Sequence, residues 1–288
     1  MNDEEGRTNM ADARPIGVFD SGIGGLTILK EIWKSLPNES TVYFGDSGRM
    51  PYGTKSHDTI ATFSVEIARF LEDQGVKLLV IACGSASSHG YEAVKQAVNI
   101  PVVEAISPGA DKAIHTTKNG RVGVIATRAT VQSEVYKNAI EARYAMNSQL
   151  PPLQVFQKAC PLFVSLAEEG WWDNEIAYLT AQSYLTELIA HDIDTLVLGC
   201  THYPLLSTTI SRVMGPTVSL VDAGESVAAT VHDILNQKKL QNLSRAVPIH
   251  RFFTSDDPQM FENQAAPFLG GGRPEGTQRA TTEKRDIL

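Results

Sequence analysis

The chain of 288 residues has little cysteine, little positive charge and no long apolar runs. Its three cysteines, Cys83, Cys160 and Cys200, form no CxxC pair, which excludes a disulfide framework and a zinc motif and indicates reduced thiols. Because 33 Asp and Glu outnumber 25 Lys and Arg, the net charge is −8, and a nucleic-acid partner is not expected. No apolar run reaches the roughly 18 to 20 residues that span a bilayer, so no membrane partner is expected either.

The N-terminal residues 1–7 are acidic and lack the positive-then-apolar order of a secretion signal, which predicts a cytoplasmic protein. With 42% hydrophobic residues, the chain has enough apolar side chains for a large core. Its length favours two domains.

Apolar runs typical of strands alternate with helical patterns along most of the chain. Strands are predicted near residues 15–19, 41–45, 77–82, 101–104, 121–126, 194–199 and 218–221. Helices are predicted near residues 24–35, 56–74, 88–98, 132–145, 174–191 and 224–236. This alternation is typical of an α/β fold with mainly parallel sheets flanked by helices.

An internal repeat supports two similar domains. Residues 16–21 and 122–127 match in pattern, and so do the runs that end at Cys83 and Cys200. We expect a pseudo-twofold pair of domains with the active site in the cleft between them. The first domain is predicted to comprise residues 15–107 plus 222–268, with residues 248–268 returning to pack on it. The second is predicted to comprise residues 108–221, and residues 1–14 and 269–288 are predicted to be flexible ends.

The two matching cysteines are the most informative feature of the chain. A cysteine in an apolar run is usually a small buried hydrophobe. Here, however, both Cys83 and Cys200 follow a run typical of a strand buried on both faces, and ligands bind at the carboxyl ends of such strands. Two opposed thiols indicate a two-base proton exchange. Cys160 lacks polar neighbours and is predicted to pack in the core.

Two polar residues stand close to strand ends or to a thiol. His202 lies two residues after Cys200 and is either a proton partner of the thiol or a core histidine bonded to a backbone carbonyl. Asp20 opens a glycine-rich loop and is either a local cap or a contact of a substrate ammonium or a catalytic group. That loop has Thr27 where a dinucleotide fingerprint needs glycine, so a nicotinamide site is not indicated.

Two further loops come after strands. Residues 45–53 read as a turn, and residues 126–130 offer hydroxyls and helix-start N–H groups that suit either an ordinary N-cap or a carboxylate. Glu168 and Glu169 read more readily as solvated charges than as catalytic groups.

Taken together and in order, residues 18–27, 45–53, 82–87 and 198–206 resemble the motifs of glutamate racemase, in the aspartate/glutamate racemase superfamily. The likeness extends over about residues 15–268. It implies an isomerase without cofactor or metal that interconverts L- and D-glutamate and supplies D-glutamate for peptidoglycan synthesis. It also implies two α/β domains that face each other across the site.

The resemblance implies roles for particular residues. Cys83 exchanges the α-proton on the D-glutamate side and Cys200 on the L-glutamate side. Asp20 supports Cys83, while His202 supports Cys200 together with a carboxylate for which we favour Glu169 over Glu168. The substrate-binding positions are Asp20, Ser21, Tyr52, Gly53, Gly84, Ser85, Thr127, Thr130, Thr201 and His202.

One departure from the family pattern lies beside the first thiol. The family usually has Asn-Thr after the cysteine, whereas this chain has Gly84 and Ser85. Ser85 keeps the hydroxyl, but Gly84 lacks an amide that would contact substrate, and an unpaired buried group costs about 1–3 kcal/mol. We therefore expect Gly84→Asn to raise kcat/KM, unless another group compensates and Asn crowds the site.

The same residues leave alternatives open. One is a related racemase with aspartate-like specificity, and another is a catalytically weak binding protein of the same fold. The intact cysteine pair disfavours the second alternative. A homodimer is left open.

Overall fold

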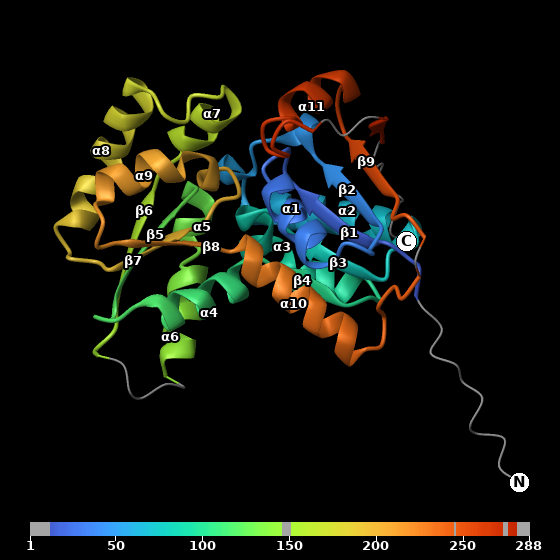
Figure 1. Cartoon of the computed structure of the whole chain (residues 1–288), viewed down its shortest axis with the longest axis horizontal. Coiled ribbons are helices and arrows are strands. Elements are labelled where there is room, and N and C mark those ends of the chain that lie inside the picture. Colours follow the sequence, from blue (N-terminus) through green and yellow to red (C-terminus); the bar gives the residue numbers. More distant parts are fainter. Residues whose placement is uncertain (1–11, 146–150, 245, 273–275, 281–288) are drawn as a thin grey trace, which may run out of the picture.

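The computed structural model describes residues 12–145, 151–244, 246–272 and 276–280. Figure 1 shows two lobes side by side, each built around its own sheet. The first sheet has the strand order β10-β9-β2-β1-β3-β4 and the second has the order β6-β5-β7-β8. Every strand pairing in both sheets is parallel. The predicted α/β class with mainly parallel sheets is therefore confirmed.

The first sheet has helices on both faces. Its strands are β1 (Ile16–Asp20), β2 (Thr41–Gly45), β3 (Leu78–Ile81), β4 (Val102–Glu104), β9 (His250–Thr254) and β10 (Gln278–Arg279). One face packs against α1 (Leu26–Ser35), α10 (Gly224–Gln237) and α11 (Pro258–Ala265). The other face packs against α2 (His57–Asp73) and α3 (Gly84–Ala97).

The second sheet repeats this arrangement with fewer strands. Its strands are β5 (Arg121–Ala126), β6 (Gln154–Ala159), β7 (Thr195–Leu198) and β8 (Ser219–Asp222). One face packs against α7 (Leu162–Glu168), α8 (Glu175–Ile189) and α9 (Ser207–Met214), with the short α5 (Arg128–Gln132) close to the strand ends. The other face packs against α4 (Ile106–Thr116) and α6 (Val135–Tyr144).

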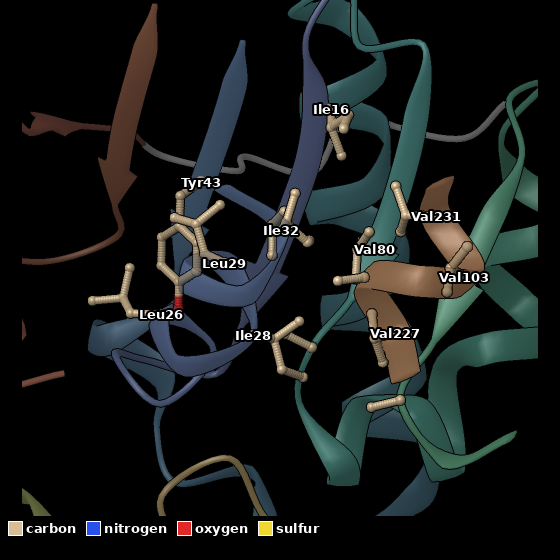
Figure 2. Close-up of a cluster of buried hydrophobic side chains, with 14 of the residues drawn as sticks. Ile16, Leu26, Ile28, Leu29, Ile32, Tyr43, Val80, Val103, Val227 and Val231 are labelled. Atoms are coloured by element: carbon tan, nitrogen blue, oxygen red, sulfur yellow. The ribbon is translucent and has the colours of Figure 1, made fainter. Parts of the chain in front are cut away.

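Burial on both faces explains the continuous apolar runs of the central strands. In β1, Val18 packs in the cluster that contains α1 and α10, whereas Phe19 packs in the cluster that contains α2 and α3. Figure 2 shows the first of these clusters, with Val80 of β3 lying opposite Val227 and Val231 of α10. Because alternate side chains point to opposite faces and both faces are covered by helices, most positions of such a strand are apolar.

The internal repeat is visible in the topology. In the first sheet β1 lies between β2 and β3, with β4 beyond β3, and in the second sheet β5 lies between β6 and β7, with β8 beyond β7. The strands that precede Cys83 and Cys200 therefore hold equivalent places in the two sheets. The chain passes from the first sheet to the second next to Ala105 and returns next to Ala223.

Several elements have no counterpart among the predicted ones. These are β6, β9, β10, α4, α5, α7, α9, α11 and the short 3₁₀ turns Ser47–Arg49, Tyr52–Thr54 and Tyr203–Leu206, while the helix predicted near 132–145 corresponds to α6. β9 and α11 lie in the segment 248–268, and β9 pairs with β2. None of the described helices is long and apolar enough to cross a membrane.

Parts of the two chain ends contact the first sheet where the structure describes them. The backbone carbonyl of Asp12 accepts a hydrogen bond from Lys77 at 2.6 Å, and β10 extends the first sheet by pairing with β9. An edge strand has unpaired backbone groups that a short segment can satisfy, which explains this pairing. Residues 1–11, 273–275 and 281–288 of the predicted flexible ends lie outside the described residues.

A buried ion pair under the first sheet gives a stability prediction. Lys77 and Glu39 lie 2.6 Å apart with almost no exposed surface, and Glu39 also accepts the backbone N–H of Asn242 at 2.8 Å. Lys77→Met leaves a buried carboxylate without its cation and is expected to cost about 3–5 kcal/mol of unfolding free energy, measured by urea denaturation.

Adding Glu39→Gln to Lys77→Met is expected to recover part of that loss, because no unpaired charge remains while Asn242 keeps its acceptor. As a control, Lys158→Met removes an exposed ion pair with Glu187 and is expected to change stability little. A loss from Lys77→Met no larger than that of Lys158→Met contradicts the prediction.

Candidate active site

A cavity of about 530 Å³ lies between the two sheets. Its lining comes from loops that come after β1, β2 and β3 of the first sheet and β5, β6 and β7 of the second. These are the strands that the repeat makes equivalent, and the carboxyl ends of parallel strands are where ligands bind in α/β folds. The topology therefore brings two equivalent sets of loops onto one cavity.

Both predicted thiols line this cavity. Cys83 comes after β3 as the residue just before α3, and Cys200 comes after β7 and a single glycine. Only 5% of Cys83 and 8% of Cys200 is exposed, so both sulfurs are largely withdrawn from bulk water. Cys160 lies in the core of the second sheet, as predicted, and does not line the cavity.

The surroundings of Cys83 keep its proton on sulfur. Its thiol donates a hydrogen bond to the hydroxyl of Ser21 at 3.5 Å. Burial and the negative charge of Asp20 raise the pKa of Cys83 to about 12, against the opposing effect of the Ser21 hydrogen bond. Cys83 is therefore a thiol at neutral pH in this state.

The surroundings of Cys200 are different. Its sulfur lies 3.8 Å from Nδ1 of His202, whose Nε2 lies 3.0 Å from Oε1 of Glu168. Burial lowers the pKa of His202, but hydrogen bonds with Cys200 and Glu168 outweigh burial and raise it to about 10. The imidazole is therefore protonated at neutral pH and links the thiol to a carboxylate.

The carboxylate beside His202 is Glu168, not the favoured Glu169. Glu168 is the last residue of α7 and lines the cavity, whereas Glu169 caps the helix and is exposed. Adjacent residues of a helix point about 100° apart, so only one of the two can face His202. The helical register of α7 determines which of the two glutamates faces His202. The sequence pattern did not predict α7, so it could not give that register.

Asp20 lies behind the cavity rather than on its wall. It is fully buried, and its carboxylate accepts hydrogen bonds from the Gly22 N–H at 2.9 Å and from the Thr201 hydroxyl at 3.3 Å. Burial raises its pKa despite His202 and these donors. The bond to Thr201 connects the first sheet to the second. It passes beside Gly24, where an added Cβ would lie 2.3 Å from the Thr201 hydroxyl.

A chain of hydroxyls crosses the cavity wall. Ser85 Oγ lies 3.0 Å from Thr127 Oγ1, which in turn lies 3.1 Å from Thr130 Oγ1. Ser85 and Thr127 line the cavity, whereas the buried Thr130 contacts Thr127 from behind. Ser85 and Thr127 therefore present hydroxyls to the cavity, and Thr130 contacts the Thr127 hydroxyl.

The loop after β2 is held by a buried carboxylate. Asp46 is fully buried, accepts a hydrogen bond from Arg49 Nε at 2.7 Å and accepts another from the Tyr52 hydroxyl. Arg49 also contacts Glu66 at 2.5 Å. The Tyr52 hydroxyl is thus bonded to Asp46, and both Tyr52 and Gly53 line the cavity.

Several lining residues were not predicted. Arg128 lies in the segment 126–130, which the sequence analysis considered for its hydroxyls. The positive charge within that segment could have indicated that Arg128 also lines the site. Most of the others come from α7, α8 and the loop before Tyr52, and only tertiary packing brings them to the site. They are Met50, Pro51, Thr54, Pro161, Leu162, Val164, Ser165, Tyr184 and Gly199.

Gly84 lies against the opposite sheet. A Cβ built at this position would lie 2.5 Å from the backbone carbonyl oxygen of Gly199. A real Cβ does not approach backbone oxygen that closely, so a side chain here would push the two sheets apart. This contradicts the expectation that Gly84→Asn recovers a substrate contact.

Comparison with known proteins places this chain in a family. Residues 16–231 match the model of the Asp/Glu/Hydantoin racemase family. A glutamate racemase of Geobacter metallireducens is 50% identical over 258 residues, which cover 90% of this chain and 93% of that protein.

Solved structures of glutamate racemases have the same fold as this chain. The crystal structure of a glutamate racemase from Francisella tularensis, in complex with D-glutamate, has a TM-score of 0.86 and 38% identity and covers 94% of this chain and 99% of that one. The crystal structure of a glutamate racemase isoform from Bacillus anthracis has a TM-score of 0.85 and 36% identity, and the match covers 94% of this chain and 98% of that one.

The fold and the family together define an isomerase that acts as an amino-acid racemase. The chain belongs to the Asp/Glu/Hydantoin racemase family.

The contact at Gly84 gives an activity prediction. We expect Gly84→Ala and Gly84→Asn both to lower kcat/KM by about 10- to 100-fold, because each displaces catalytic groups of one sheet relative to the other. Gly272→Ala is a matched control, since an added Cβ there meets no described atom within 4 Å. Racemase assays on the folded variants check this, and a rise in kcat/KM for Gly84→Asn contradicts it.

The pair formed by His202 and Glu168 gives a pH prediction. The pKa of His202 is raised from 6.5 to about 10, so the folded protein keeps a proton that the unfolded chain has released. The proton on His202 therefore stabilises the folded protein. This stabilisation is fully present below pH 6.5 and is lost as the pH rises toward 10.

Glu168→Gln is expected to weaken this pH dependence, because it removes one group that raises the pKa, whereas Glu169→Gln should keep it. Urea unfolding between pH 6.5 and 9 checks this prediction. The range ends at pH 9 because the thiols of the unfolded chain, with an ordinary pKa of 9.0, begin to titrate there. Equal slopes for wild type and Glu168→Gln contradict the prediction.

Proposed function

We propose that this protein is a glutamate racemase that interconverts L- and D-glutamate without a cofactor, with Cys83 and Cys200 as its two bases. The observation that carries the proposal is that both thiols line one cavity from equivalent strand ends of two facing sheets. Racemisation requires a proton to leave one face of the α-carbon and another to arrive on the opposite face. Two opposed thiols suit that requirement.

In the L-to-D direction, Cys200 acts as the base. As a thiolate it takes the α-proton of L-glutamate, and the thiol of Cys83 gives its proton to the opposite face of the α-carbon. One C–H bond breaks and another forms, and the enzyme is left with a Cys200 thiol and a Cys83 thiolate. The D-to-L direction reverses each step.

The different surroundings of the two sulfurs fit this starting state. The raised pKa of Cys83 keeps a proton ready for donation, while the protonated His202 offers Cys200 a positive partner. After an L-to-D turnover Cys200 must lose a proton and Cys83 must gain one. Because His202 is already protonated, the net exchange goes to and from solvent, while His202, held by Glu168, stays beside Cys200 as its positive partner. Burial raises the pKa of Asp20, which makes this carboxyl a better proton acceptor than an exposed one.

The carbanion needs stabilisation in the transition state. Negative charge spreads into the adjacent carboxylate, and the hydroxyls of Ser85 and Thr127 on the cavity wall are held in place as donors for it. Fixed donors in a cavity that excludes water stabilise such charge without reorganising. We further propose that the product D-glutamate supplies peptidoglycan synthesis in the cytoplasm.

Replacing either thiol tests the mechanism. Cys83→Ala and Cys200→Ala are each expected to lower racemisation in both directions by at least about 1000-fold, because each direction needs one base and one acid. Cys160→Ala removes a buried thiol outside the cavity and is expected to keep most of the activity. Circular dichroism with both enantiomers of glutamate and aspartate, without added cofactor, monitors the reaction.

Near wild-type racemisation by either Cys83→Ala or Cys200→Ala contradicts the two-thiol mechanism. Racemisation of aspartate but not glutamate by the wild-type protein overturns the substrate assignment. A folded wild-type protein that racemises neither favours the binding-protein alternative.

A further inference from the structure

The cavity contains an arginine to which the proposed mechanism gives no role. Arg128 is the one Lys or Arg among the described residues that line the cavity. It begins α5, directly after Thr127, and its side chain is exposed. Thr127 lies against Gly53 of the first sheet's loop, so Arg128 lies where the two halves of the cavity meet.

The guanidinium of Arg128 has no carboxylate partner among the described residues. No hydrogen bond or ion pair joins it to any of the residues for which such contacts are described. Arg49 differs, because its charge is already bonded to Asp46 and Glu66. Arg128 therefore has up to five N–H donors and a full positive charge that no described carboxylate neutralises, at a position that lines the cavity.

The charge of the molecule makes such a cation useful. The protein carries a net charge of −8, and Glu168 adds a carboxylate to the cavity wall. An amino acid with two carboxylates and one ammonium has a net negative charge and is repelled by that field. A cation at the cavity raises the local concentration of an anionic ligand and its association rate.

We propose that Arg128 binds a carboxylate of the substrate and selects dicarboxylic amino acids over neutral ones. The inference rests on the proposed function, because it takes an anionic amino acid as the ligand. Arg128 acts in binding, whereas proton transfer depends on the thiols. Its removal should therefore raise KM and leave kcat nearly unchanged.

The test compares Arg128→Gln and Arg128→Lys with the control Arg69→Gln, which removes an exposed arginine of α2 that does not line the cavity. For Arg128→Gln we expect KM for glutamate to rise about three- to tenfold, with kcat within about twofold of wild type. Arg128→Lys should recover part of the loss. Added salt should shrink the difference between wild type and Arg128→Gln, because it screens an exposed charge.

Binding of glutarate, measured by calorimetric titration, provides a readout that does not depend on racemisation. Glutarate has two carboxylates and no α-amino group, and Arg128→Gln should weaken its binding about three- to tenfold, whereas Arg69→Gln should not. Equal KM values and equal glutarate affinities in Arg128→Gln and Arg69→Gln overturn the proposal. A fall in kcat with unchanged KM and glutarate affinity also overturns it, since that pattern indicates a structural role.

The two proposals fail in different ways. A folded wild-type protein that does not racemise glutamate refutes the proposed function, and the glutarate titration still decides the role of Arg128. A wild-type protein that binds glutarate no better than Arg128→Gln refutes that role, whatever the outcome of the racemase assay.

Discussion

The close approach of the two sheets at their strand ends is the constraint on which the site depends. Gly84 lies against the carbonyl of Gly199, and the buried carboxylate of Asp20 accepts a hydrogen bond from Thr201 of the other half. Neither contact leaves room for an extra side chain. Because Gly84 and Thr201 each adjoin a cysteine, these contacts also determine how the two thiols face the cavity.

Duplication supplies two similar strand ends, but the residues around them have diverged. Cys83 donates to a hydroxyl near a buried carboxylate, whereas Cys200 contacts a protonated imidazole that is bonded to Glu168. The first arrangement keeps a proton on sulfur, and the second offers a positive partner to a thiolate. A symmetric scaffold thus carries an acid and a base that exchange roles with the direction of the reaction.

Features that depend on local pattern were predictable from the sequence. The central strands, both cysteines and the hydroxyl residues belong to this group, because buried parallel strands are apolar throughout and ligands bind at their ends. α7 lacked a clear pattern, so the sequence could not decide between Glu168 and Glu169. The contact between Gly84 and Gly199 depends on how the sheets pack, and nothing in the local pattern around either glycine indicates that they meet.

Solvent deuterium exchange tests the two-thiol account most directly. When L-glutamate reacts in D₂O, the account predicts that each D-glutamate formed early carries deuterium at its α-carbon, while the remaining L-glutamate keeps hydrogen. The reason is that the proton that leaves goes to Cys200, and the one that arrives comes from the solvent-exchanged Cys83. Early D-glutamate that retains the substrate hydrogen, or equal early deuteration of both enantiomers, contradicts the account, because either result indicates a single base serving both faces.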